Sequence, residues 1–185
     1  MLSGFAIEKL IAVIAFAFVL ICLPLPGMAQ NLELEAARKA YANGAYDYAL
    51  KVFRLGTETE MKEAQFWLGL LYDRGHGVER NQKIALQWFK KAAEQGHAEA
   101  QRVIGVYLEE GIVIDRDLPQ AAEWYSRSAA QNNAKAQRNL AQLYVWGRGV
   151  ARDYVKAGRL LQSAANLGTA KAKRCLLYTS PSPRA

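Results

Sequence analysis

Residues 64–78 read Ala-Gln-Phe-Trp-Leu-Gly-Leu-Leu-Tyr-Asp-Arg-Gly-His-Gly-Val, and this stretch decides the fold because its pattern returns every 36 residues. Successive blocks open at Ala64-Gln65, Ala100-Gln101 and Ala136-Gln137, and a fourth begins at Lys171-Ala172, where Ala172 is the residue in register. Glycine, arginine and alanine then recur in register at Gly75, Gly111 and Gly147, at Arg80, Arg116 and Arg152, at Ala85, Ala121 and Ala157, and at Ala93, Ala129 and Ala165. No block of this length buries its apolar face alone, so the period predicts stacked units that share one continuous core.

Each block has the pattern of a helix, a loop and a second helix. Ala64, Leu68 and Tyr72 fall four residues apart, which predicts a first helix with one apolar face. Gly75 is expected to end that helix, since glycine accepts the left-handed conformation. Helix-capping side chains recur before the second helix at Asn81, Asp117 and Asp153. The second helix is expected to end at Gly96, Asn132 and Gly168 in the three blocks.

The repeat pattern divides the chain into segments. A half-diverged helix pair, with a turn at Asn43-Gly44, is expected to cap the stack at residues 30–63. Repeats follow at residues 64–99, 100–135 and 136–171, and residues 172–185 hold the start of a truncated repeat and a tail.

The pattern of the first block resembles that of the Sel-one-like repeat (SLR) family, which is similar to the tetratricopeptide repeats. The positions that carry the resemblance are Ala64, Leu68, Gly69, Tyr72, Gly75, Gly77, Val78, Ala85, Trp88, Phe89, Ala92, Ala93 and Gly96. The resemblance covers residues 64–174 well and residues 32–63 loosely. It implies an all-α fold, a right-handed α–α superhelix of helix pairs, and the role of an adaptor that binds proteins without catalysis.

Some positions depart from the family pattern. Leu108 stands where the first block has Tyr72, and Val113 stands where it has Gly77. The third block has Ala141 in place of Gly69 and Leu160-Leu161 in place of Trp88-Phe89. These changes affect the expected loop shape and packing of the later blocks, but not the fold.

Residues 1–29 have the pattern of a secretory signal. Lys9 precedes an apolar run from Leu10 to Leu23, and Gly27-Met28-Ala29 supplies small residues for cleavage. The run is shorter than the roughly 20 residues of a membrane span. We therefore expect export to the periplasm or the medium, with a mature chain that starts at Gln30. A retained membrane anchor is the alternative.

The other end of the chain has an unusual composition. Residues 175–184 read Cys-Leu-Leu-Tyr-Thr-Ser-Pro-Ser-Pro-Arg, which resembles a translated sequencing adapter. Pro181 and Pro183 cannot continue the helix expected at this place in the repeat. We expect the natural chain to continue into more repeats, and a genuine disordered Ser/Pro tail is the alternative.

Composition excludes several kinds of chemistry from residues 30–174. Both cysteines, Cys22 and Cys175, lie outside that range, so it has no disulfide, thiol nucleophile or cysteine metal ligand. His76 and His97 lie in predicted turns, without metal-binding or catalytic spacing, and are expected to be exposed. Glu109-Glu110 is expected to be a solvated edge. We therefore predict no catalytic residue, no metal site and no cofactor.

Charge is concentrated at one end. Residues 135–174 hold nine basic residues and one acidic residue, a net charge of +8, whereas residues 30–134 have a net charge of −2. The basic surface is expected to include Arg148, Arg152, Lys156 and Arg159. It could attract an anionic envelope polymer or lipid, or be a solvated face. No nucleic-acid-binding motif is present, so nucleic acid is not expected as a partner.

The recognition surface is expected where the blocks differ from one another on their first helices, which generally line the concave side of such solenoids. We predict that a segment of another protein binds there. The expected contacts are the apolar anchors and arginines Phe66, Leu70, Arg102, Arg138 and Trp146. Packing of Phe66 and Trp146 on neighbouring blocks is the alternative. A third possibility is a hydrolase encoded beyond residue 174.

Overall fold

The computed structural model describes residues 26–179, with side chains from residue 30 to residue 168. The described residues form eight helices and no strand: α2 (Pro26–Ala42), α3 (Tyr46–Glu58), α4 (Lys62–Arg74), α5 (Gln82–Glu94), α6 (Ala98–Glu110), α7 (Leu118–Ala130), α8 (Ala134–Trp146) and α9 (Tyr154–Thr179). The chain has two compact units, one up to Val52 and one from Phe53 onward. The apolar run of the expected export signal and residues 180–185 of the tail lie outside the described residues.

The first unit holds α2 and the start of α3. Gly44 has a φ angle of 82° and makes the predicted turn between the two helices. Leu34, Ala37 and Ala49 are buried, so the two helices have apolar faces of the expected kind.

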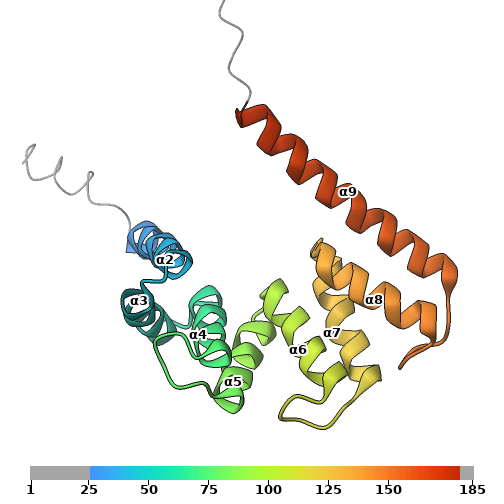
Figure 1. The fold of residues 1–185 in the computed structure, drawn as a ribbon, viewed down its shortest axis with the longest axis horizontal. Helices are drawn as coiled ribbons and strands as arrows, with labels where there is room; N and C mark the ends of the chain where they lie inside the picture. The colour runs from blue at the N-terminus through green and yellow to red at the C-terminus, as the bar shows by residue number, and fades with distance from the viewer. Residues whose placement is uncertain (1–25, 180–185) are drawn as a thin grey trace, which may run out of the picture. The chain divides into compact units, whose positions relative to one another are not determined.

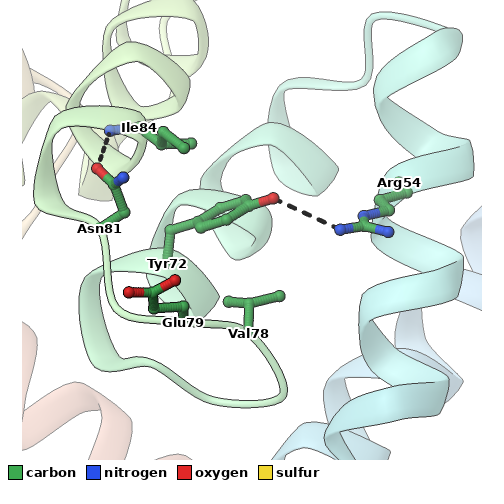
Figure 2. A pocket seen from close by; sticks show the side chains of 6 residues that line it. All are labelled: Arg54, Tyr72, Val78, Glu79, Asn81 and Ile84. Carbon is green, nitrogen blue, oxygen red and sulfur yellow. Dashed lines mark hydrogen bonds between the residues drawn. The ribbon is translucent and has the colours of Figure 1, made fainter.

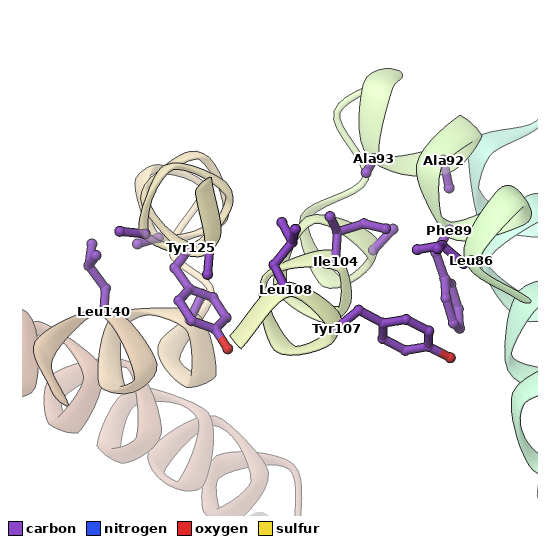
Figure 3. Close-up of a cluster of buried hydrophobic side chains, with 14 of the residues drawn as sticks. Leu86, Phe89, Ala92, Ala93, Ile104, Tyr107, Leu108, Tyr125 and Leu140 are labelled. Carbon is purple, nitrogen blue, oxygen red and sulfur yellow. The ribbon is translucent and has the colours of Figure 1, made fainter. Parts of the chain in front are cut away.

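The second unit contains three consecutive helix pairs (Figure 1). α4 packs on α5, α6 on α7 and α8 on α9, and the pairs are joined because α5 also packs on α6 and α7 on α8. Figure 3 shows Phe89, Ile104, Tyr107, Leu108 and Tyr125 in the resulting core. The expected all-α arrangement of helix pairs, in which one core runs through successive repeats, is therefore confirmed.

Most predicted helix ends are confirmed. Gly75, Gly111 and Gly147 cap α4, α6 and α8 in the left-handed conformation, with φ angles of 72°, 73° and 64°. The side chains of Asn81, Asp117 and Asp153 accept hydrogen bonds from the backbone N–H three residues later. These caps satisfy backbone groups that a helix leaves without partners at its ends.

The prediction that Gly168 ends the last helix is wrong. Gly96 and Asn132 have φ angles of 80° and 61° and turn the chain after α5 and α7, but α9 continues through Gly168 to Thr179. After the turns at Gly96 and Asn132, the complete first helix of the next repeat follows and packs on the preceding helix, α6 on α5 and α8 on α7. After Gly168 the repeat pattern lasts only to Arg174, so continuation of the helix, which keeps its internal hydrogen bonds, is favoured.

Val113 replaces the glycine found at this place in the loops of the other two repeats, yet it keeps the same loop shape. It has a φ angle of 55°, close to the 68° of Gly77 and the 71° of Gly149 at the equivalent places. A β-branched residue is strained in this conformation. The loop geometry is thus imposed by the rest of the repeat and not by the residue at this position.

Candidate functional site

The surface of the first helices α4, α6 and α8 is the candidate site, and the predicted contact residues differ widely in exposure on it. Phe66 is only 7% exposed, and its ring stacks on that of His97 at 4.5 Å between centroids. Leu70 and Arg102 are half-buried, and Arg138 is exposed. Trp146 is 66% exposed, so its ring is available to a partner. The burial of Phe66 leaves little of that ring for a partner to contact.

The arginines on this surface have different surroundings. Arg102 Nη2 lies 2.9 Å from Glu99 Oε1, so it is held by an ion pair within α6. Burial opposes ionisation of Glu99, but hydrogen bonds from Arg102 and Asn133 hold the pKa of that carboxyl below its usual value. The guanidinium of Arg102 is therefore positioned, whereas Arg138 extends into solvent.

Polar contacts connect the first helix of one repeat to the first helix, or to the loop that follows it, in the neighbouring repeat. The hydroxyl of Tyr107 donates to Asp73 Oδ1 at 2.6 Å, and Arg148 Nη2 lies 3.5 Å from Glu109 Oε1. Burial and the Asp73 carboxylate raise the pKa of Tyr107, which therefore stays a neutral donor. These contacts link α4 to α6, and the end of α6 to the loop that follows α8, so neighbouring repeats are joined on this face.

Tyr125 makes a similar contact within the second repeat. Its hydroxyl donates to Glu109 Oε2 at 2.9 Å. Burial and the Glu109 carboxylate raise the pKa of Tyr125, so this phenol also stays protonated. These tyrosines are structural donors, and neither has the lowered pKa of a nucleophile.

The predicted basic residues lie on α9 and the loop that precedes it. Lys156 Nζ lies 3.6 Å from Asp153 Oδ2 and 5.4 Å from the centre of the Tyr144 ring, and Arg148 pairs with Glu109. Arg152 and Arg159 are exposed. The basic surface is thus partly neutralised by acids of the same unit.

His97 has a role that the sequence analysis missed, because it was expected to be exposed. Its side chain is only 10% exposed. Its Nδ1 accepts from the backbone N–H of Ala100 at 3.1 Å, and its Nε2 lies 2.9 Å from Glu63 Oε2. His97 therefore caps α6, the first helix of the second repeat, and ties its start to Glu63 on α4. The signal was its register with Asn133, which caps α8 and donates to Glu99 in the same way.

Buried glutamines on the first helices accept hydrogen bonds from exposed glutamines at the ends of the second helices. Gln95 donates to Gln65 Oε1 at 3.0 Å, and Gln131 donates to Gln101 Oε1 at 2.8 Å. Gln101 also donates to the backbone carbonyl of Ala93. The period places Leu167 where the third donor would be, and Gln137 Oε1 is a buried acceptor without a hydrogen-bond partner in the described part of the chain.

Replacing Leu167 with glutamine is expected to complete this contact. The variant should raise the free energy of unfolding by about 1 kcal/mol relative to Leu167→Met, because a buried acceptor gains a donor while the side-chain length stays the same. Urea unfolding of both variants measures the difference. Equal stability would show that Gln137 Oε1 needs no donor from this position.

A small hollow lies beside the first helix pair. Figure 2 shows the lining residues Arg54, Tyr72, Val78, Glu79, Asn81 and Ile84, and the volume is about 310 Å³. Arg54 donates to the Tyr72 hydroxyl at a long 3.5 Å, and Asn81 is occupied in capping α5. The hollow holds no nucleophile with an adjacent base. Among the described residues there is also no group of three or more potential metal ligands.

None of the helices in residues 26–179 combines the length and the apolarity needed to cross a membrane.

Three successive helix pairs, joined by polar contacts at each boundary, define a helical-repeat protein of the solenoid class. A family model described as "Sel1 repeat" matches residues 62–97, 98–133 and 134–169. The chain therefore belongs to the Sel1 repeat family. Proteins of this family are generally scaffolds for protein interactions and typically are not enzymes.

Solved structures of this class are similar to the chain. A Sel1 repeat protein from Oxalobacter formigenes is 36% identical over 75% of this chain and 57% of its own, with a TM-score of 0.69. The protective antigen c5321 of uropathogenic Escherichia coli, which displays an SLR fold, is 32% identical over 78% of this chain and 31% of its own, with a TM-score of 0.67. The chain thus spans less than two thirds of either structure.

A third structure supports the fold alone. Helicobacter pylori cysteine rich protein B is 22% identical over 72% of this chain and 89% of its own, with a TM-score of 0.51. Among curated protein sequences, no significant match was found.

Proposed function

We propose that this protein is an exported, non-enzymatic scaffold that binds a segment of another protein along the surface of α4, α6 and α8. The observation that carries the proposal is the pair of polar contacts that join neighbouring repeats on this face. Because Asp73 is bonded to Tyr107 and Glu109 is paired with Arg148, side chains from three repeats are held at fixed spacing. A preorganised surface loses little entropy when it binds an extended segment.

The exposed side chains suggest what this surface binds. Trp146 offers a large apolar contact, while the half-buried Arg102 and the exposed Arg138 supply positive charge. Aromatic and arginine side chains are favoured in the energetic centres of interfaces. The partner segment would therefore combine an apolar side chain with acidic groups.

Charge reversal tests this surface. We expect the pair Arg102→Glu and Arg138→Glu to lower partner capture from the host envelope at least about tenfold, because two attractions become repulsions. Circular dichroism should show an unchanged helix content, and the melting temperature should fall somewhat because the glutamate in place of Arg102 would face Glu99. Undiminished capture by a folded variant would exclude these arginines from the site.

A second candidate function is docking on an anionic glycan or lipid surface. It is favoured by Arg152, Lys156 and Arg159, which are exposed near or on α9. Binding of this kind depends on long-range charge, so it should be lost at high salt, whereas an apolar contact at Trp146 should persist. Capture at low and high salt therefore separates the two functions.

Export is a further part of the proposal, and it depends on residues 1–29. The apolar run and the small residues before Gln30 support it. Mass spectrometry of the protein recovered from the periplasm or the medium should show a first residue at Gln30. An intact apolar segment would instead indicate a membrane anchor.

A further inference from the structure

The hollow beside the first helix pair is lined by side chains from several elements of the second unit. Arg54 lies near the end of α3, Tyr72 lies on α4, and Val78 and Glu79 lie in the loop between α4 and α5. The volume of about 310 Å³ is at the lower end of the range for small-molecule pockets. The hollow therefore has room for a small molecule.

One side of the hollow presents hydrogen-bond donors that have no strong acceptor. Figure 2 shows the Tyr72 hydroxyl pointing toward Arg54, whose Nη2 atom donates to it at 3.5 Å, the outer limit for such a bond. Because the oxygen of Tyr72 accepts in this contact, its O–H group is left to donate, and the guanidinium has further N–H donors. Among the described residues, neither group has another side-chain partner. A carboxylate accepts from both groups and therefore fits this side.

The other side of the hollow presents a negative charge and an apolar wall. Glu79 is exposed, and its carboxylate makes no ion pair or hydrogen bond with any described residue. Figure 2 shows Val78 between Glu79 and the guanidinium of Arg54, so the two opposite charges lie apart. Val78 and Ile84 are half-buried and supply apolar surface. An ammonium group fits Glu79, and an aliphatic group fits the wall.

The repeat itself does not require these polar residues. The period relates Arg54, Tyr72 and Glu79 to one residue each in the later blocks. In the next block these are Lys90, Leu108 and Asp115, which keep the charges but lack the hydroxyl. In the block after that they are Ser126, Tyr144 and Ala151, which keep the hydroxyl but lack both charges. The combination thus occurs at one boundary, and the packing of the repeat does not explain it.

We propose that this hollow binds a free α-amino acid with an aliphatic side chain. Its carboxylate would bind the guanidinium of Arg54 and the hydroxyl of Tyr72, and its ammonium group would bind Glu79. The aliphatic side chain would lie against Val78 and Ile84. None of the residues proposed to bind a partner protein lines the hollow, so the inference goes beyond the proposed function and does not depend on it.

Isothermal titration calorimetry of the full chain with four probes tests the proposal. The probes are leucine, N-acetyl-leucine without the ammonium group, leucinamide without the carboxylate, and glycine without the aliphatic side chain. We expect leucine to bind with a Kd below about 1 mM. It should bind at least about tenfold more tightly than either derivative, because each derivative loses a charge-assisted hydrogen bond. Glycine should bind more weakly than leucine, because it makes no contact with the apolar wall.

Two variants separate the two ends of the ligand. Arg54→Gln should weaken leucine binding by at least about tenfold and leave leucinamide binding unchanged. Glu79→Gln should weaken leucine binding in the same way and leave N-acetyl-leucine binding unchanged. Both side chains are exposed, so both variants should fold, which circular dichroism checks. Lys90→Gln and Asp115→Asn, at the equivalent exposed places in the next block, are matched controls that should not change leucine binding.

Several outcomes would overturn the proposal. A Kd for leucine above about 1 mM would exclude a built site for this ligand. N-acetyl-leucine that binds as tightly as leucine would assign the hollow to the C-terminal residue of a peptide instead. Leucine binding that is unchanged in a folded Arg54→Gln variant, or reduced as much by Lys90→Gln, would show that Arg54 does not hold the carboxylate.

Discussion

Replacing Gly105 with alanine is expected to lower the free energy of unfolding by about 2 kcal/mol, although alanine favours helices more than glycine does. A Cβ atom at Gly105 would lie 2.5 Å from Cε1 and 2.6 Å from Cδ1 of the Tyr125 ring. That ring is fully buried, so it cannot move aside without disturbing the core. Urea unfolding followed by circular dichroism measures the change.

Gly158 is a matched control for this prediction. It also lies within a helix, α9, but a Cβ atom there would meet nothing within 4 Å. Gly158→Ala should therefore raise the free energy of unfolding by about 0.5–1 kcal/mol, which is the helix propensity of alanine alone. If Gly105→Ala were stabilising as well, the close approach of α6 and α7 at Tyr125 would be refuted.

The third repeat suggests a variant that rescues Gly105→Ala. At the equivalent places it has Ala141 in the first helix and Leu161 in the second. Alanine is larger than the glycine of the second repeat, and leucine is smaller than its tyrosine. In a Tyr125→Leu background, Gly105→Ala should thus have little effect or a favourable one. A double-mutant cycle gives the coupling between the two positions, which we expect to be about 2 kcal/mol.

Replacing Gly149 with valine is expected to destabilise the protein by about 3 kcal/mol or more. Gly149 has a φ angle of 71°, which a β-branched residue adopts only with strain. A Cβ atom there would also lie 2.6 Å from the Cβ and the carbonyl oxygen of Leu118, at the start of α7. Backbone atoms cannot rotate away, so the loop of the third repeat would have to move. Thermal unfolding measures the loss.

Val113 is the matched position in the second repeat, and the opposite change there should stabilise the protein. Val113 has a φ angle of 55° and is 42% exposed. Val113→Gly should raise the free energy of unfolding by about 1 kcal/mol, because strain is removed and little apolar contact is lost. A destabilised Val113→Gly together with a neutral Gly149→Val would contradict the account of both loops.

Much of the local structure was predictable from the sequence. The period of 36 residues, the glycines at the ends of the first helices and the caps at Asn81, Asp117 and Asp153 all depend on neighbours along the chain. Those interactions recur wherever the same residues recur, so one block predicts the others. The family followed from the same pattern.

The candidate site was less predictable, because exposure depends on which repeat lies next to a residue. Phe66, Arg102 and Arg138 occupy equivalent places, yet Phe66 is buried, Arg102 is half-buried and Arg138 is exposed. Phe66 stacks on His97, the residue that caps α6 of the next repeat, whereas no further repeat covers Arg138 in the described residues. Comparison of the blocks finds the variable positions but does not show which of them a neighbouring helix covers.

The sequence by itself determined the class of protein, the helix pairs and most of their ends, since periodic apolar faces and capping residues act over a few residues. Only the tertiary structure decided that His97 caps α6 while contacting Glu63 on α4, that Gln137 Oε1 finds no donor among the side chains described, and that α9 continues through Gly168. These features depend on contacts between residues about 30 or more positions apart, or on whether a neighbouring helix is present. The physical reason is that packing between repeats sets which side chains are buried and which hydrogen bonds form.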